Sequence, residues 1–419
     1  MQYLTKLIFA ASLAGALFTP NATSQDNNAR QLSFDSIIKT EDKGTSVLVI
    51  PMNGQMSTDI TIDAYRPLKS KIEELNPDLI VLKMLCQDFV DDIHEIERHG
   101  DEEEKNRYNS EQIEKISKLF RIDLKNIDQV LWIEDSYGAS TVLSLSWPNI
   151  YMSKKARLIG DKDYHYQRWN YIAPNLPTWG KMYKASIAHA KTAADMGERS
   201  HHLVLSFIDP GQICTGTYEG RNVIWEDNLD GYLILDTEDF KSEGGRMNSF
   251  MTYPFRIYSD EAESFAISKG TVRDLEEVLL NEGIREYHLV GENLTESIDQ
   301  YKIDWRKALV KATDYIEDFK LYREWVTGED AEKYLRKQLN AIKQVYRLMK
   351  NWDAIEQRMK MKNGLTIKIE YKEYGYKYVP DIIKQIEEQL RKLRENEDSG
   401  RGRRGGGGLA GSSGGGGIR

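Results

Sequence analysis

Residues 46–82 of this 419-residue chain, SVLVIPMNGQMSTDITIDAYRPLKSKIEELNPDLIVL, give the strongest indication of its fold class. It begins with one apolar run, Ser46–Pro51, and ends with a second, Leu79–Leu82. Between the two runs, apolar residues recur at helical spacing over Asp63–Leu75. Short, continuous apolar runs are typical of parallel strands that are covered on both faces. The stretch therefore predicts a strand-helix-strand unit.

The same alternation of strand and helix signals continues along the chain. Strands are expected at Val130–Ile133, Asn149–Met152, Val223–Trp225, Tyr232–Leu235 and Glu286–Val290. Helices are expected at Ala139–Ser146, 179–198, Ser259–Gly270 and Thr271–Glu282, with Ser259 and Thr271 as N-caps. Alternating helices and strands favour layered α/β architecture over a β-sandwich.

The character of the chain changes near residue 295. From there to residue 362 nearly all residues are helix formers, and a strand at Thr366–Tyr371 and a helix at Pro380–Glu395 are expected to follow. Gly, Arg and Ser dominate the C-terminal end, a composition typical of disorder. We expect a signal peptide at 1–24, a linker at 25–44, an α/β domain at 45–294, a mostly helical module at 295–398 and a disordered tail at 399–419.

The N-terminal residues have the pattern of a secretory signal. Lys6 precedes the apolar run Leu7–Phe18, Pro20 breaks this run, and Ala22–Ser24 supplies small residues for cleavage. The apolar run is too short to cross about 30 Å of hydrocarbon. We therefore expect cleavage near Ser24 and an exported protein, periplasmic or secreted, whose mature form has no transmembrane segment.

Composition limits the partners that we expect. The formal net charge is −9, whereas nucleic-acid binding needs a basic face that displaces counterions. The acidic run at 88–95 lacks the spacing of known metal ligands, so neither a metal nor another cofactor is expected. Cys86 and Cys214 are too few for a disulfide framework; two buried free thiols are the simpler expectation, and pairing stays open.

One segment has the residue types of an acyl-transfer site. Gly138-Ala139-Ser140-Thr141 follows an expected buried strand and opens an expected helix. The free backbone N–H groups at a helix start, here those of Gly138, Ala139 and Thr141, favour the negative charge of an oxyanion. Ser140 is therefore the candidate nucleophile.

A serine nucleophile also needs a base. The seven histidines are scattered, and none forms a recognisable pair with an aspartate. A lysine can take this role if it is neutral, although at its ordinary pKa only about one lysine in 2,500 is neutral at pH 7. Burial lowers that pKa by up to several units. Lys181 is the candidate base, with Lys184 as the alternative.

These segments together resemble signal peptide peptidase A, the NfeD-type proteases and, more distantly, the Clp proteolytic subunit, all of the ClpP/crotonase-like fold. In these families a serine in a small-residue Ala-Ser context at a helix start is the nucleophile, and Ser140 matches it. The first two families use a lysine some tens of residues further on, and Lys181 matches the NfeD type. The resemblance covers about residues 45–290 and implies a Ser-Lys peptidase that acts on peptides or proteins and assembles into homo-oligomers.

One departure from the families concerns the oxyanion hole. They carry an Asp-x-Pro-Gly-Gly-like turn after the second strand, whereas Lys83–Phe89 contains no glycine here. Bulky residues hinder a close approach of backbone N–H groups to a substrate. Two hypotheses therefore stay open: an exported Ser-Lys serine peptidase, and a catalytically inactive protein of the same fold used for binding or scaffolding. An acyl-CoA enzyme of the crotonase branch is disfavoured by export.

Overall fold

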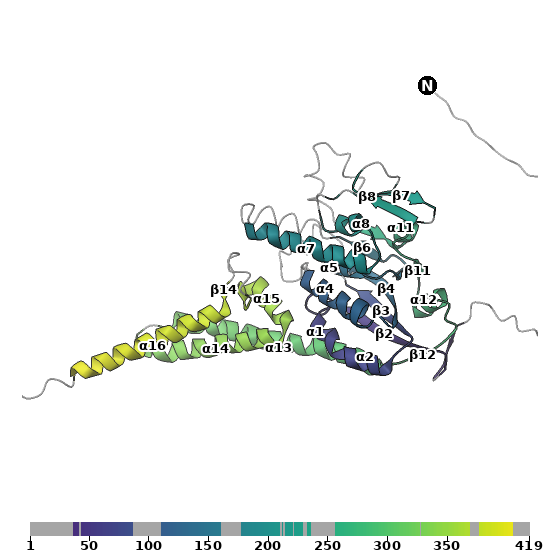
Figure 1. The fold of residues 1–419 in the computed structure, drawn as a ribbon. Helices are drawn as coiled ribbons and strands as arrows, with labels where there is room; N and C mark the ends of the chain where they lie inside the picture. Colours follow the sequence, from purple (N-terminus) through teal and green to yellow (C-terminus); the bar gives the residue numbers. More distant parts are fainter. Residues whose placement is uncertain are drawn as a thin grey trace, which may run out of the picture. The chain divides into compact units, whose positions relative to one another are not determined.

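The structure is a computed structural model, shown in Figure 1. It describes residues 37–41, 43–86, 110–160, 177–209, 212, 214–220, 222–228, 233–235, 256–326, 328–368 and 377–404. The expected signal peptide, most of the expected linker and most of the expected tail lie outside the described residues.

A curled, mostly parallel sheet forms the centre of the α/β part. Its strand order is β1-β12-β2-β3-β4-β5-β11, and all neighbours along this path are parallel. Strand β6 continues alongside the end of β4, and β10 pairs with β6 in the antiparallel sense. The strands are β1 Ile38–Lys39, β2 Thr45–Asn53, β3 Leu79–Leu85, β4 Asp128–Tyr137, β5 Ile150–Ser153, β6 Arg157–Ile159, β10 Arg256–Tyr258, β11 Gly270–Val272 and β12 Glu286–Leu289.

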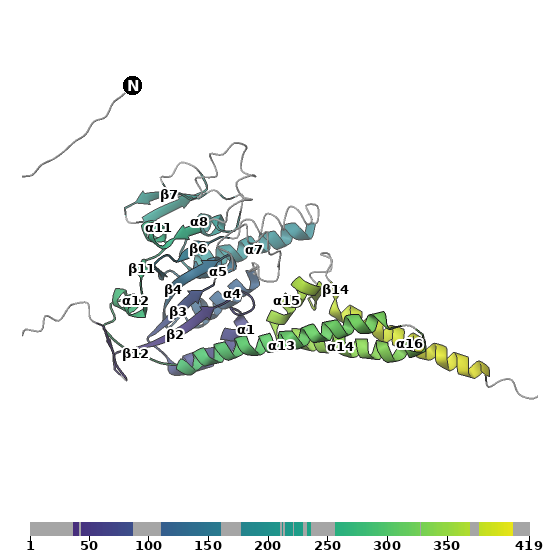
Figure 2. The same cartoon turned by 180° about the vertical axis from the view of Figure 1, so that it is seen from behind.

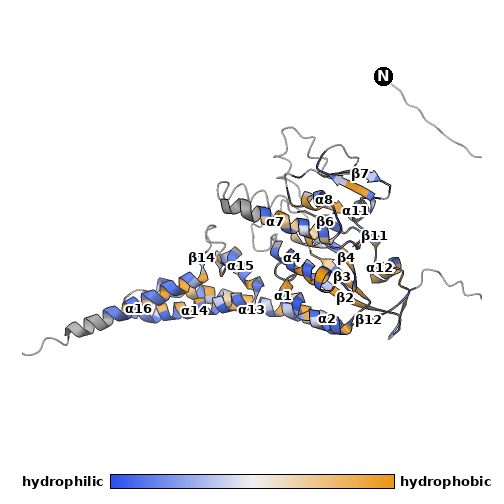
Figure 3. Ribbon diagram, viewed as in Figure 1, coloured by the Kyte–Doolittle hydropathy of each residue, from blue (hydrophilic) through white to orange (hydrophobic). Residues whose placement is uncertain are grey.

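Helices cover both faces of this sheet. On one face, α4 (Ser110–Lys118), α5 (Ala139–Ser144) and α7 (Pro177–Met196) pack on an apolar core that includes Leu48 and Ile50. On the other, α12 (Leu275–Asn281) packs on a smaller cluster that includes Val47 and Val81. Neighbouring residues of one strand thus enter different cores, which explains why β2 and β3 read as continuous apolar runs. Figure 3 shows these strands in hydrophobic colours.

The helix expected over Asp63–Leu75 is interrupted. Helix α1 spans Ile62–Tyr65, a 3-10 turn follows at Arg66–Leu68, and α2 spans Lys69–Leu75. The turn contains Pro67, whose ring removes a backbone donor and disfavours a regular helix at this point. Asn76 then ends α2 in the left-handed region with φ 42°.

Between residues 259 and 282 the two predicted helices are present but shorter than expected, and both predicted caps were wrong. Helix α11 spans Ser259–Ser264 and its N-cap is Tyr258, so Ser259 is not the cap. Gly270–Val272 is strand β11, paired with β5, so Thr271 caps no helix. Asp274 is the N-cap of α12, and its side chain accepts the Glu277 N–H at 3.0 Å. The edge of β5 pairs with Gly270–Val272 and makes this segment a strand. Local helix propensity cannot predict such a pairing, because the partner strand is distant in sequence.

A small antiparallel sheet adjoins the α/β core. Its order is β8-β7-β9, with β7 at Cys214–Glu219, β8 at Asn222–Glu226 and β9 at Leu233–Leu235. Helix α8, His201–Ser206, contacts both β7 and β8.

The C-terminal part is mostly helical, as predicted. The predicted α/β class of the core is also confirmed. Helix α13 contributes Leu294 and Ile298 to the main core, and further along Ala308 and Ile316 to a second apolar core. Helices α13, α14 and α16 lie side by side in both views (Figures 1 and 2). The elements are α13 Glu292–Glu324, α14 Ala331–Asn351, α15 Asp353–Asn363, β13 Leu365–Thr366, β14 Lys377–Tyr378 and α16 Val379–Arg404. None of the helices in the described part of the chain has the length and hydropathy of a membrane span.

Candidate functional site

The candidate residues lie where β4 passes into α5. Strand β4 ends at Tyr137, Gly138 turns the backbone with φ 58° and ψ −117°, and α5 begins at Ala139. These dihedral angles favour glycine, because a Cβ atom would be strained there. The Gly138 N–H donates to the carbonyl of Ile159 at 2.8 Å. Strand β6, which contains Ile159, therefore holds the turn in place.

Ser140 lies in the first turn of α5 with 0% of its surface exposed. Its Oγ accepts the Tyr137 N–H at 2.9 Å and donates to the Tyr137 carbonyl at 2.8 Å. The Oγ of Ser136 lies 3.0 Å away. A hydroxyl has one donor hydrogen and two acceptor lone pairs, so these contacts account for its full hydrogen-bonding capacity.

Ser140 belongs to a group of buried hydroxyls. The Oγ of Ser136 also lies 3.3 Å from the Oγ of Ser144 and 3.4 Å from the Oγ1 of Thr141, and all four side chains are fully buried. Thr141 Oγ1 donates to the Ile159 carbonyl at 2.8 Å. Hydroxyls that bond one another avoid the cost of burying unpaired polar groups. The group thus fastens α5 to β4 and β6.

Two of the three candidate backbone donors at this turn, those of Gly138 and Thr141, are also engaged. The Thr141 N–H donates to the Gly138 carbonyl at 3.1 Å, and the Gly138 N–H donates to β6 as described. At the end of the neighbouring strand β3, the Cys86 N–H donates to the Asp135 carbonyl at 3.0 Å. The glycine-free segment after β3 thus begins by extending the pairing with β4. Residues 87–89 of that segment lie outside the described residues.

Lysines 181 and 184 both lie in α7, which packs against α5. The side chain of Lys181 lies outside the described residues, so the Ser140–Lys181 pair stays a prediction. Lys184 is exposed.

A buried ion pair, which the sequence did not indicate, lies directly before the turn. Asp135 is 5% exposed, and its carboxylate accepts from three nitrogens of Arg157 at 2.6 to 3.3 Å. Arg157 is the first residue of β6. No local pattern marks a pair of this kind, because it depends on β6 returning to the end of β4.

No group of three potential metal ligands occurs among the described residues. The acidic run at 88–95 lies outside them. Cys86 and Cys214 are both buried and free of a disulfide bond. Both thiols are therefore buried, as the simpler expectation from the sequence had it.

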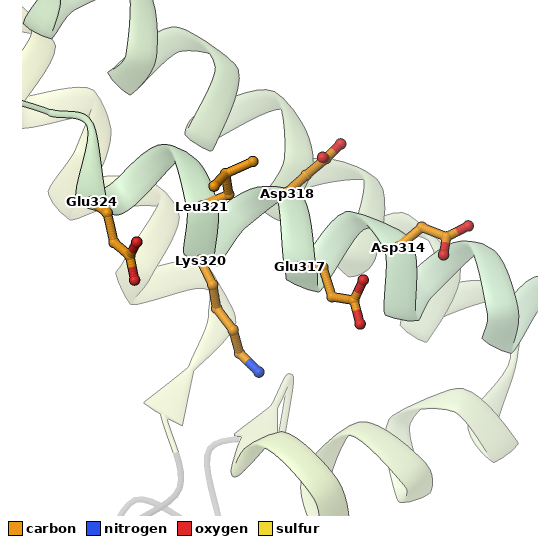
Figure 4. A pocket seen from close by; sticks show the side chains of 6 residues that line it. All are labelled: Asp314, Glu317, Asp318, Lys320, Leu321 and Glu324. Carbon is orange, nitrogen blue, oxygen red and sulfur yellow. The ribbon is translucent and has the colours of Figure 1, made fainter.

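A hollow of about 510 Å³ lies on the surface of α13 (Figure 4). Most of its lining side chains are acidic, and all come from a single helix: Asp314, Glu317, Asp318, Lys320, Leu321 and Glu324. The hollow contains none of the candidate catalytic residues.

Comparisons with known proteins found structural likeness only. No family model and no curated protein matches the chain. The 1510-N membrane protease specific for a stomatin homolog from Pyrococcus horikoshii matches at 16% identity and a TM-score of 0.32, over 57% of this chain and 79% of that chain. A peptidase from Plasmodium falciparum matches at 12% identity and a TM-score of 0.32, over 54% and 96%.

A third similar structure is a ClpP1 mutant from Listeria monocytogenes, with 9% identity, a TM-score of 0.30, and coverage of 55% of this chain and 94% of that chain. Likeness at this level concerns the fold and is silent on substrate and activity. The strand order and the helices on both faces describe a layered, mostly parallel α/β core, followed by a mostly helical part.

Proposed function

We propose that this chain is an exported protein of the ClpP/crotonase-like fold whose serine site is catalytically inactive, and that it acts as a binding or scaffold module for polypeptides. The hydrogen-bonded, fully buried hydroxyl of Ser140 carries this proposal. A serine nucleophile must present an activated hydroxyl to a substrate carbonyl. The hydroxyl of Ser140 instead stabilises the turn between β4 and α5.

The backbone donors around Ser140 support the same proposal. An oxyanion hole needs N–H groups that point at the developing charge, and losing one such donor costs about 10²- to 10³-fold in rate. The N–H groups of Gly138, Thr141 and Cys86 all donate to backbone carbonyls. The absence of glycine from 83–89 agrees with this arrangement.

A serine-directed probe tests the proposal. The mature protein is treated with a fluorophosphonate between pH 7 and 10, beside Ser140→Ala and Lys181→Ala variants and an active serine hydrolase as a positive control. We expect no labelling of the folded wild type while the control hydrolase is labelled. Labelling of the wild type that both substitutions abolish would overturn the proposal.

The stability of the Ser140→Ala variant gives a second, independent readout. Alanine removes the acceptor of the Tyr137 N–H in a buried turn, so we expect a loss of about 1–3 kcal/mol in the free energy of unfolding. Ser146→Ala is the matched control, since its buried hydroxyl makes one hydrogen bond, to the Leu143 carbonyl at 2.6 Å. A smaller loss is expected there, of about 1 kcal/mol. Equal effects would argue against a special structural role for Ser140.

A Ser-Lys endopeptidase is the second candidate function. The strand-turn-helix position of Ser140 and the packing of α7, which contains Lys181, against α5 favour it. In that mechanism a neutral Lys181 removes the Ser140 proton while Ser140 attacks a peptide carbonyl. The turn must then open to release the Ser140 hydroxyl from Tyr137. The probe experiment above separates the two candidates.

Export and homo-oligomeric assembly belong to the same proposal. Export rests on the signal pattern at residues 1–24, and assembly rests on the family resemblance alone. Cell fractionation with N-terminal sequencing of the mature protein tests the first, and an N-terminus near Gln25 in the exported fraction is the expected result. Light scattering of the mature protein tests the second. A monomer at all concentrations would remove assembly from the proposal.

A further inference from the structure

The loop at Gly54–Thr61, termed the Asp59 loop, follows β2 at the sheet edge where β3 and β4 also end. The Gly54 N–H donates to the Leu85 carbonyl at 3.0 Å, and beyond it the Cys86 N–H donates to the Asp135 carbonyl. A line of backbone hydrogen bonds therefore connects the loop to the end of β4. Strand β4 ends at Tyr137, and Ser140 lies in the first turn of the helix that follows.

The carboxylate of Asp59 is the centre of this loop and is 2% exposed. One oxygen, Oδ2, accepts the Gln55 N–H at 3.1 Å and lies 2.8 Å from Nη2 of Arg306. The other, Oδ1, accepts the indole N–H of Trp305 at 3.1 Å. Donors from the loop and from α13 thus meet on one buried charge, which is stable only when it is paired and hydrogen-bonded.

The loop is built closely around this carboxylate. A Cβ atom on Gly54 would lie 2.4 Å from Asp59 Oδ2, so only glycine allows this approach. The N–H groups of Asp59 and Ile60 both donate to the Gln55 carbonyl, at 2.9 and 3.0 Å. Arg358 of α15 donates to the Gln55 side chain. Both α13 and α15 therefore bind the loop.

The position of Trp305 within α13 is also informative. Residues before it, such as Ile298, belong to the core of the α/β part, and residues after it, such as Ala308, belong to the core of the C-terminal helices. Trp305 itself is 2% exposed. The Asp59 contacts thus occur where α13 passes from one apolar core to the other.

A second polar contact joins the same two parts of the chain. The buried Gln112 of α4 accepts from Thr61 Oγ1 at 3.0 Å and from the Ile62 N–H at 2.8 Å. Its amide nitrogen donates to Asp353 Oδ2 at 3.0 Å. Asp353 is the first residue of α15, so this side chain also connects the end of the Asp59 loop to the C-terminal helices.

We propose that Asp59 is the anchor through which the C-terminal helices control the sheet edge that bears Ser140. Displacement of α13 withdraws Trp305 and Arg306 from the carboxylate, and the loop then loosens together with its hydrogen bonds to β3. This coupling goes beyond the proposed function, since it holds for an inactive or an active Ser140.

Hydrogen exchange of the full mature chain tests the coupling. The variants are Trp305→Phe, which removes the indole donor and keeps an aromatic ring, and Arg306→Gln at a side chain that is 52% exposed. In both, we expect the amides of Gly54, Gln55, Asp59 and Ile60 to exchange about tenfold faster, as the loss of a hydrogen bond to a charged group implies. Strand β7 is the internal reference and should keep its wild-type rate.

Arg336→Gln is the matched control. This substitution breaks an arginine–carboxylate pair between Arg336 and Glu332 at 2.6 Å. Both residues belong to α14 and not to the Asp59 loop or to α13. We expect wild-type exchange at Gly54–Ile60 in this variant. Faster exchange confined to α13 in the Trp305 and Arg306 variants, with the loop unchanged, would overturn the proposal. An equal rise in β7 would do the same, because it would indicate general destabilisation.

Discussion

The guanidinium of Arg157 binds both oxygens of the Asp135 carboxylate, with Nη2 2.6 Å from Oδ2 and Nε 3.3 Å from Oδ1. The backbone N–H of Arg157 adds a third contact, at 3.1 Å to Oδ1. This geometry fixes the start of β6 beside the end of β4. Because β6 also accepts hydrogen bonds from Gly138 and Thr141, the pair supports the whole turn around Ser140.

Replacing Arg157 by Met should therefore destabilise the protein. The substitution keeps an apolar stem but leaves the Asp135 carboxylate, 5% exposed, without its ionic partner. Removing one member of a buried pair costs about 3–5 kcal/mol, and the partial exposure of Arg157, 21%, reduces this to roughly 2–3 kcal/mol. Urea denaturation measures the change. Arg273→Met, at an exposed pair with Glu277, is the control and should leave the midpoint unchanged.

Substitution of Gly138 by Ala should cost more than the same change at Gly364. Gly138 has φ 58° and ψ −117°, outside the left-handed helical region, so a Cβ atom there adds roughly 2–3 kcal/mol of strain. Gly364 has φ 62° and ψ 25°, where alanine costs about 1–2 kcal/mol, and nothing lies within 4 Å of the added Cβ. Thermal unfolding of the two variants gives the comparison. A larger loss at Gly364 would contradict the geometry of the turn.

The Asp63→Asn variant should stabilise the protein at neutral pH. Burial and the nearby Asp353 carboxylate raise the pKa of Asp63, while Arg66 and Lys115 act in the opposite direction. A raised folded-state pKa means that ionisation destabilises the fold, so the stability linked to Asp63 is lost as pH rises through this pKa. Asparagine resembles the neutral carboxyl and avoids this loss.

Urea midpoints of the wild type and Asp63→Asn, measured between pH 7 and pH 4, test this prediction. We expect the advantage of the variant to be largest at pH 7 and to shrink toward pH 4, as the wild-type Asp63 gains its proton. An advantage that is constant with pH would mean that the substitution acts through packing and not through charge.

Much of the α/β core was predictable because its strands are short, apolar runs that can be recognised from neighbouring residues alone. The runs Ser46–Pro51, Leu79–Leu82 and Val130–Ile133 all lie within observed strands, since both faces of these strands are buried. Strand β11 was missed for the opposite reason. It has three residues, and Gly270–Val272 is extended only because the edge of β5 lies beside it.

The candidate site divides in the same way. The sequence placed Ser140 at the start of a helix after a buried strand, and the structure agrees. Its burial and its hydrogen bonds could not be anticipated, because they depend on the backbone of Tyr137, on Ser136 and on the return of β6. The local sequence around a serine at a helix start is the same whether its hydroxyl is exposed to substrate or buried and hydrogen-bonded.

Local patterns in the sequence predicted the alternation of strands and helices, the change to a helical C-terminal part, and the turn with glycine before Ser140. Hydrophobic periodicity and backbone sterics depend on residues that are close in sequence, so these features can be predicted from the sequence. The contact of Asp59 with Trp305, 246 residues away, and that of Asp135 with Arg157 form only when the chain folds. A buried charge is paired with residues from distant segments that folding brings together. A local sequence pattern therefore does not identify these partners.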